Sequence, residues 1–368
     1  MKKNLFILGI AALAFAACSN DEVVEVNQGE AINFRSNMNK VTRADEMTSA
    51  AVLKDFTVYA KKNSDNSEYF SDVVFTGPTT YTSNPKYYWP SYALDFYAYS
   101  VHTTTGVVAT EDGQVTHSTG AANYQTFTIT PATSVANQVD FIYAINNGSG
   151  SGVSKIESVP LAFAHKESKI VLKIKNTSAN ISFDVTGWEL GFVKPNGSTT
   201  DGGNTWTAGG TADASVVYTA TCTSNTIPVD QSTAMWLGST GTPSTSEADK
   251  VLSMILIPQT TPTPVSAYAS GADGAAVNGA YIGITYTATN TITSESLANA
   301  VTGIWKMPSI TWQPGYQYTY TIDIADGGYN KTNVNSTDEK LDPILGDYIK
   351  FATVTISDWT NSDQSVSM

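Results

Sequence analysis

Alternation of apolar and polar side chains is the feature that most constrains how this chain can fold. It recurs in short runs, clearest at 56–60, 94–99, 170–175 and 316–324. A period of two places successive side chains on opposite faces of a β-strand. The runs are rich in Val, Ile, Thr and Tyr, and clusters of Gly, Asn, Ser and Pro separate them. Because no stretch shows a sustained helical stripe, the sequence predicts an all-β protein made of sandwich strands.

The length of the chain allows two such sandwiches. Its 368 residues exceed a typical single domain. The Gly/Ser-rich stretch at 148–152 is a candidate linker. We therefore predict an N-terminal domain over residues 44–155 and a C-terminal domain over residues 156–368.

The first residues have the composition of an export signal. Lys2 and Lys3 precede an apolar run at 5–17, which is too short to span a bilayer, and Cys18 follows small residues. This pattern predicts a lipoprotein signal peptide over 1–17 and a diacylglycerol on Cys18 that anchors the exported chain to a membrane. The alternative is an ordinary secretory signal beside which Cys18 lies by chance.

The arginines are confined to the start of the chain. Arg35 and Arg43 are the only two, and every later cation is Lys. An Arg-specific protease could therefore remove a leader over 18–43 and find no further site. We predict cleavage after Arg43, which makes Ala44 the new N-terminus, while strand pairing could protect Arg35. Chance placement in a tolerant terminus is the alternative.

Charge and reactive residues argue against several function classes. The net charge of −13 disfavours nucleic acid as a partner, since phosphate binding needs clustered cations. No metal-ligand spacing, nucleophile motif or cofactor motif is present, so we expect no enzyme, metal site or cofactor. Asp95, Asp140 and Glu189 could form a glycosidase pair only if the fold brings them together. His165 is expected to be a packing or hydrogen-bonding residue.

Several short motifs, in this order, give the chain a family resemblance. After the lipoprotein leader they are DFTVYA (55–60), YYWP (87–90), LDFYAY (94–99), VDFIYA (139–144), LAFAHKESKI (161–170), MILIPQ (254–259), WQPGY (312–316) and VTISDW (354–359). With them the chain resembles the fimbrillin family, the pilins and pilin-like lipoproteins of type V pili.

The resemblance implies a fold and an assembly mechanism. It implies two consecutive transthyretin-like β-sandwich domains after a lipoprotein leader. It also implies a protease cut that removes a first strand, placed here at Ile32 to Phe34. A C-terminal strand of a neighbouring subunit, here within 351–368, would then fill the groove. Other pilin subunits, a surface receptor and, for the precursor, the outer membrane are the implied partners of a shaft or tip subunit of a fimbrium.

A second class of function stays open. The chain could be a cell-surface carbohydrate-binding lipoprotein that never polymerises, because its seven Trp and nineteen Tyr residues could build a sugar-stacking surface. The fate of the leader separates the two hypotheses.

Overall fold

Strands form where the sequence alternates. The computed structural model describes residues 30–36, 53–103, 113–118, 124–150, 156–213, 215–246, 252–262, 279–330, 353–358 and 362–364. Within these ranges the chain forms strands and short 3₁₀ turns and no α-helix, so the all-β prediction is confirmed. No helix in these ranges is long and apolar enough to cross a membrane.

One five-stranded sheet organises the first part of the chain. Its order is β3 (Glu68–Thr76), β2 (Asp55–Lys62), β4 (Leu94–Thr103), β7 (Val139–Ser149) and β9 (Ala164–His165). Both faces are covered. On β4, Phe96 and Ala98 belong to one apolar cluster, while Tyr97 and Tyr99 belong to another. This explains why every residue at 94–101 is buried.

A second, smaller sheet covers the tyrosine face. Its order is β13 (Thr207–Gly209), β12 (Asn196–Thr199), β6 (Phe127–Ile129) and β5 (Val115–His117). β12 pairs with β6, opposing Thr199 to Phe127 and Gly197 to Ile129. Strands from before and after residue 155 thus share one sheet. The domain limits at 44–155 and 156–368 stay a prediction.

The later strands build a sandwich around the largest apolar cluster. One sheet has the order β14 (Val217–Ile227), β11 (Ile181–Gly191), β17 (Tyr281–Asn290), β18 (Val301–Lys306) and β20 (Tyr329–Asn330). The other has the order β15 (Gln231–Trp236), β10 (Ser168–Asn176), β19 (Tyr316–Asp323), β21 (Thr353–Asp358) and β22 (Ser362–Gln364), with β16 (Met254–Leu256) also pairing with β10. Side chains of both sheets share the cluster.

The strand at 316–323 shows how alternation becomes a core. Tyr318, Tyr320 and Ile322 are each at most 1% exposed, whereas Tyr316 at its start is 39% exposed. Its neighbours are β10 in parallel and β21 in antiparallel orientation.

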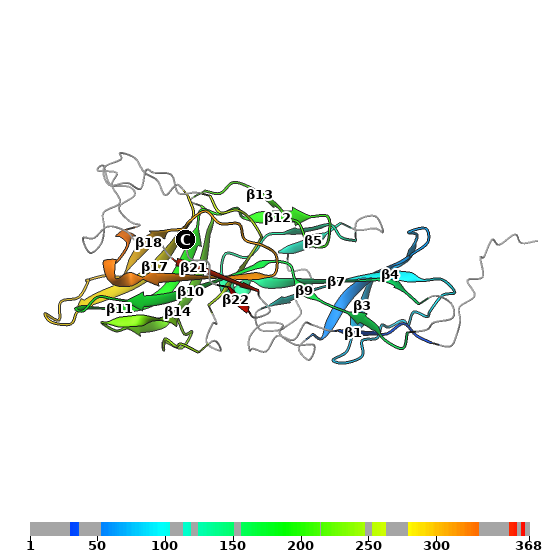
Figure 1. Ribbon diagram of the computed structural model, residues 1–368, viewed down its shortest axis with the longest axis horizontal. Coiled ribbons are helices and arrows are strands. Elements are labelled where there is room, and N and C mark those ends of the chain that lie inside the picture. The colour runs from blue at the N-terminus through cyan, green and yellow to red at the C-terminus, as the bar shows by residue number, and fades with distance from the viewer. Residues whose placement is uncertain are drawn as a thin grey trace, which may run out of the picture.

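The molecule is elongated. In Figure 1, β1 (Phe34–Ser36), β3 and β4 lie at one end of the long axis and β11, β14 and β17 at the other, with β5, β12 and β13 between them. The small sheet is thus the joint between the two ends.

Candidate functional site

The first described residues lie as a strand inside the N-terminal core. We call residues 30–36 the N-terminal segment. Its β1 pairs in parallel with β8 (Val159–Leu161), and its other edge meets the chain at 81–89 through bridges at Tyr81 and Tyr88. Its backbone hydrogen bonds are Ile32 N–H to Tyr87 O (2.8 Å), Phe34 N–H to Tyr81 O (3.1 Å), Tyr81 N–H to Phe34 O (2.8 Å), Trp89 N–H to Glu30 O (3.2 Å) and Val159 N–H to Asn33 O (2.8 Å). The segment is therefore hydrogen-bonded along both edges.

Alternate side chains of the segment enter the core. Ile32 is 1% exposed and Phe34 is fully buried. The Phe34 ring makes edge contacts to Phe56, Phe75 and Phe96, at centroid distances of 5.9, 4.6 and 5.0 Å. Edge-to-face aromatic contacts add to the free energy gained by burying the ring. Phe34 thus occupies the centre of the aromatic cluster.

Tyr81 fixes the far end of the segment. Its hydroxyl donates to the Leu53 carbonyl (2.7 Å) and lies 3.3 Å from Ser36 Oγ. Burial raises the pKa of Tyr81, which keeps this hydroxyl a donor. Arg35 points the other way and is exposed, and its backbone position opposes Pro160 of β8.

The predicted site residues divide into two groups. Ile32 and Phe34, predicted as the removable strand, lie side by side in the buried segment. Cys18, Arg43 and Ala44, predicted for lipidation and cleavage, lie outside the described residues. Tyr81, which bonds to Phe34 through both backbone groups, was not predicted from the sequence. Tyr87 and Trp89, which also bond to the segment, lie in the YYWP motif (87–90), where no such role was predicted.

The C-terminal candidate donor lies in its own sheet. β21 pairs with β19, opposing Val354 to Tyr320 and Ile356 to Tyr318, and β22 folds back on β21. Val354 is 3% exposed, and Ile356 is half-buried. In this chain the segment therefore has an intramolecular partner.

A buried polar cluster lies where β9 leads into β10. His165 Nδ1 is 2.8 Å from Asp140 Oδ2, and Glu167 Oε2 accepts the Phe141 N–H (3.0 Å). Burial, and secondarily the Asp140 carboxylate, raises the pKa of Glu167 well above its usual value. The Glu167 carbonyl accepts the Gly315 N–H (2.8 Å). The cluster thus links β7 to the chain just before β19, which is a structural role.

Asp95, another carboxylate considered for catalysis, makes hydrogen bonds that hold neighbouring parts of the fold together. Asp95 Oδ1 accepts from Asn63 Nδ2 (2.8 Å) and from the Gly148 N–H (2.7 Å). Glu189 lies on β11, in a different sheet from Asp95 and Asp140. Across the described ranges, no three His, Cys, Asp or Glu side chains form a group that could hold a metal ion.

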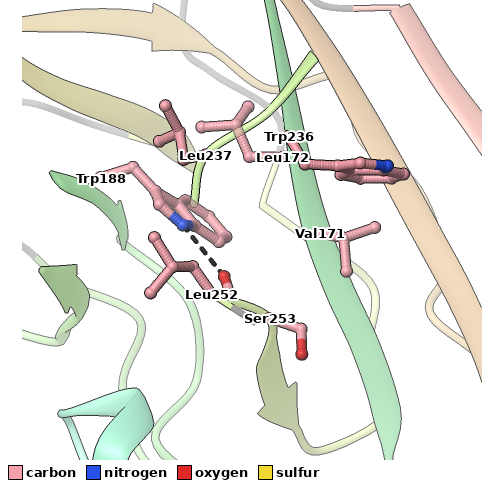
Figure 2. Close-up of a pocket in the computed structure, with 7 residues that line it drawn as sticks. All are labelled: Val171, Leu172, Trp188, Trp236, Leu237, Leu252 and Ser253. Atoms are coloured by element: carbon pink, nitrogen blue, oxygen red, sulfur yellow. Dashed lines mark hydrogen bonds between the residues drawn. The ribbon is translucent and has the colours of Figure 1, made fainter. Parts of the chain in front are cut away.

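Two hollows differ in what they can hold. Figure 2 shows the smaller, about 10 Å³, with Trp188 and Trp236 on opposite sides and the Trp188 indole N–H donating to the Leu252 carbonyl (3.1 Å). It has room for a single water molecule at most. The larger, about 490 Å³, is an open groove beside the β12–β13 hairpin, lined by Trp206, Thr311 and neighbouring residues. Only the second has the size of a ligand site.

Comparison with known proteins gives the family. A family profile described as fimbrillin-like matches residues 42–359. The fold is similar to that of a candidate cell adhesion protein of Bacteroides uniformis (TM-score 0.45, 17% identity, 90% of this chain and 99% of that one). It is also similar to a candidate cell adhesion protein of Bacteroides ovatus (TM-score 0.47, 15% identity, 91% and 99%).

A candidate adhesin of Bacteroides thetaiotaomicron is a further similar structure (TM-score 0.38, 10% identity, 80% of this chain and 91% of that one). No curated protein matches the chain. Since the family profile spans most of the sequence, the chain belongs to the fimbrillin-like family.

Proposed function

We propose that this chain is a shaft or tip subunit of a surface fimbria that assembles by strand exchange. Membership of the fimbrillin-like family indicates a cell adhesion protein of the cell surface. The observation that carries the finer proposal is the N-terminal segment, which is bonded along both edges and buries Ile32 and Phe34. A strand in that position, joined to a leader that a protease can cut, is suited to replacement by another strand.

Export and cutting come first in this proposal. A lipid on Cys18 delivers the precursor to the outer membrane, and cleavage after Arg43 leaves Ala44 as the N-terminus. Cleavage there separates residues 30–36 from the rest of the chain. The segment is then held only by non-covalent contacts, so that it can leave.

Loss of the segment would open a site for a second copy. Phe56, Phe75 and Phe96 would lose their shared partner ring, and the Tyr81 and Val159 N–H groups would lose their acceptors. Unpaired strand edges beside an apolar groove recruit an added strand through main-chain hydrogen bonds and alternate side chains. Head-to-tail contacts of this kind extend into a filament.

The C-terminal strand is the proposed donor. Ala352, Val354 and Ile356 alternate with Thr353 and Thr355, which matches the two-residue spacing of Ile32 and Phe34. Because β21 pairs with β19 in the single chain, donation requires β21 to leave that sheet. A subunit whose β21 stays paired with β19 could accept a strand without donating one, and would then stand at the end of a filament as a tip subunit.

The remaining features stay part of the proposal. We place two transthyretin-like sandwiches at 44–155 and 156–368, with other pilin subunits and a surface receptor as partners and without enzymatic activity. A non-polymerising carbohydrate-binding lipoprotein is the second candidate function, and the groove beside Trp206 supports its carbohydrate-binding part.

Substitution of each arginine in turn tests the proposal. We expect Arg43→Ala to remain a folded precursor without filaments, because the N-terminal segment stays attached. Arg35→Ala, the matched control, keeps the cut site and should form normal filaments that begin at Ala44. N-terminal sequencing of surface protein and electron microscopy measure both outcomes. Normal filaments from Arg43→Ala, or recovery of the wild type only in the Cys18-lipidated form, would refute it.

A further inference from the structure

The groove at the joint between the two ends of the molecule has the properties of a binding site. Its walls are the β12–β13 hairpin, the chain after β16 and the chain before β19, and its volume is about 490 Å³. That volume lies in the range of small-molecule sites. We propose that this junction groove binds a neutral oligosaccharide. The proposal rests on the carbohydrate-binding candidate function named above and does not depend on strand exchange.

Trp206 provides a fixed aromatic wall. Its indole N–H donates to both the Lys166 carbonyl (2.8 Å) and the Gly203 carbonyl (3.0 Å). The ring packs over Gly197, where an added Cβ would lie 3.3 Å from Trp206 Cε3. Trp206 is half-buried, and it lines the groove. Sugars present apolar C–H faces that stack on aromatic rings, and a ring already held in place loses little entropy when it binds one.

The hairpin that carries Trp206 is itself rigid. Asp201 Oδ1 accepts from the backbone N–H groups of Asn204 (3.0 Å) and Thr205 (2.9 Å). Asn204 Oδ1 in turn accepts from Lys166 Nζ (2.6 Å), which orients the amide at the groove. These contacts preorganise the wall before a ligand arrives.

The opposite wall offers hydroxyl and amide groups. Thr260 and Thr311 are exposed, and their hydroxyl oxygens lie 2.8 Å apart. Gln313 is exposed beside them. The buried Gln259 side chain holds this wall to the Lys194 backbone, accepting its N–H (2.8 Å) and donating to its carbonyl (3.2 Å). Hydroxyls and amides both donate and accept, which suits the hydroxyl groups of a sugar.

The charge of the groove indicates a neutral ligand that is bound and not cleaved. Among the described residues that line it there is no Asp, Glu or His, and Lys194 is the sole cation. Lys194 Nζ already donates to the Ala208 carbonyl (3.2 Å). Glycoside hydrolysis generally uses a pair of carboxyl groups, which these lining residues do not supply.

A peptide fits the groove less well than a sugar. Peptides that add to a sheet need free main-chain groups at a strand edge. β13 is the edge strand here, and its Ala208 carbonyl is occupied by Lys194. We therefore make peptide binding an outcome of the test.

The test uses the full chain with Cys18→Ala, so that it is free of lipid. The probes are neutral tri- to hexasaccharides of glucose, galactose, mannose and xylose, measured by calorimetric titration. We expect at least one probe to bind, Thr311→Arg to weaken that binding by about tenfold or more, and Trp206→Ala to abolish it. Thr293→Arg, an exposed threonine in the turn after β17, is the matched control and should bind as the wild type does.

Two readouts keep the result interpretable. Thermal unfolding checks that each variant folds, and Thr311→Arg decides the matter if Trp206→Ala does not, because Thr311 is exposed. Absence of binding to every probe, equal binding by Thr311→Arg, or binding of a 351–368 peptide that Thr311→Arg blocks would overturn the proposal. None of these results bears on cleavage after Arg43, so the two proposals fail separately.

Discussion

Phe34 is the residue on which the N-terminal segment most depends. Truncation to Ala removes a fully buried ring among Phe56, Phe75 and Phe96. We expect Phe34→Ala to lower the free energy of unfolding of the precursor by about 3–5 kcal/mol. Urea unfolding of the Arg43→Ala precursor, with and without the change, measures this.

The exposed neighbour provides the control for Phe34. Arg35→Ala should change the unfolding free energy by roughly 0.5 kcal/mol or less. In filaments whose segment has been cut off, Phe34→Ala should have no effect on stability. A loss below about 1 kcal/mol in the precursor would contradict the packing described here.

Glu167 should make stability depend on pH. Its pKa is raised in the folded state, so the folded chain holds this proton more tightly than the unfolded chain does. The resulting stabilisation is complete below the ordinary glutamate pKa of 4.5 and is lost as pH rises through the raised pKa. Glu167→Gln keeps an acceptor for the Phe141 N–H without the buried charge.

We therefore expect the free energy of unfolding of Glu167→Gln to exceed that of the wild type by about 1–2 kcal/mol at pH 8. This difference should disappear at pH 4. Denaturant titrations across that range measure the difference. Glu68→Gln, at an exposed position, controls for the loss of one negative charge. Equal pH profiles for Glu167→Gln and wild type would count against the assignment.

At the residue scale, alternation in the sequence predicts which side chains of a strand share a face. Ile32 and Phe34 are two positions apart and share a face, and Arg35 between Phe34 and Ser36 points outward. Tyr81 could not be predicted as the partner of Phe34 because 47 positions separate them, and local pattern does not encode such contacts.

At the scale of elements, β1 can be tied to β8 to test exchange. Arg35 and Pro160 are paired positions on these parallel strands. Neighbouring strands lie about 4.8 Å apart, within the Cα spacing that a disulfide tolerates. In the double variant Arg35→Cys/Pro160→Cys we expect cleavage after Arg43 to proceed while the segment stays attached. Oxidised protein should then form no filaments, and reductant should restore them.

Each single cysteine variant controls for the substitutions themselves. Both should polymerise under oxidising and reducing conditions alike. Normal filaments from the oxidised double variant, with the disulfide verified by mass spectrometry, would show that the segment need not leave.

Elements were more predictable than their pairing. The runs at 94–99 and 170–175 lie within strands, and the run at 316–324 fills β19 up to its end at Asp323. Yet β10 and β19 pair in parallel although their paired residues are 148 positions apart. This pairing follows from the shared core and not from either strand alone.

At the scale of the whole molecule, the small shared sheet should couple the two ends. Gly202 in the β12–β13 hairpin has φ +70° and donates its N–H to the Gln125 carbonyl (2.9 Å). An added Cβ would overlap the buried Tyr143 ring. We expect Gly202→Ala to cost about 2–4 kcal/mol and to replace one unfolding transition by two in calorimetry.

Gly148→Ala is the matched control for this substitution. Its φ is +69°, but an added Cβ would meet nothing within 4 Å. It should cost only the backbone strain, about 1 kcal/mol, and keep a single transition. Identical behaviour of the two variants would mean that the hairpin does not couple the ends.

The joint itself was beyond prediction from sequence. A Gly/Ser stretch at 148–152 suggested separate units, and composition identifies flexible chain well. Composition cannot show that the strands at 127–129 and 196–199, on either side of this stretch, pair with each other. That pairing depends on where the sheet edges of the two halves of the chain lie in space. The groove beside Trp206 arises from the same arrangement and was likewise missed.

In the proposed strand exchange, the neighbours of the N-terminal segment would also give the fibre a direction. The segment runs parallel to β8 and antiparallel to the chain at 81–89. A strand entering in reverse would meet the Tyr81 and Val159 N–H groups out of register, since parallel and antiparallel ladders space their bonds differently. Every subunit of an exchanged fibre would therefore face the same way. Such a fibre has two unlike ends, one with an unfilled groove and one with an unused strand, and it can grow by different chemistry at each.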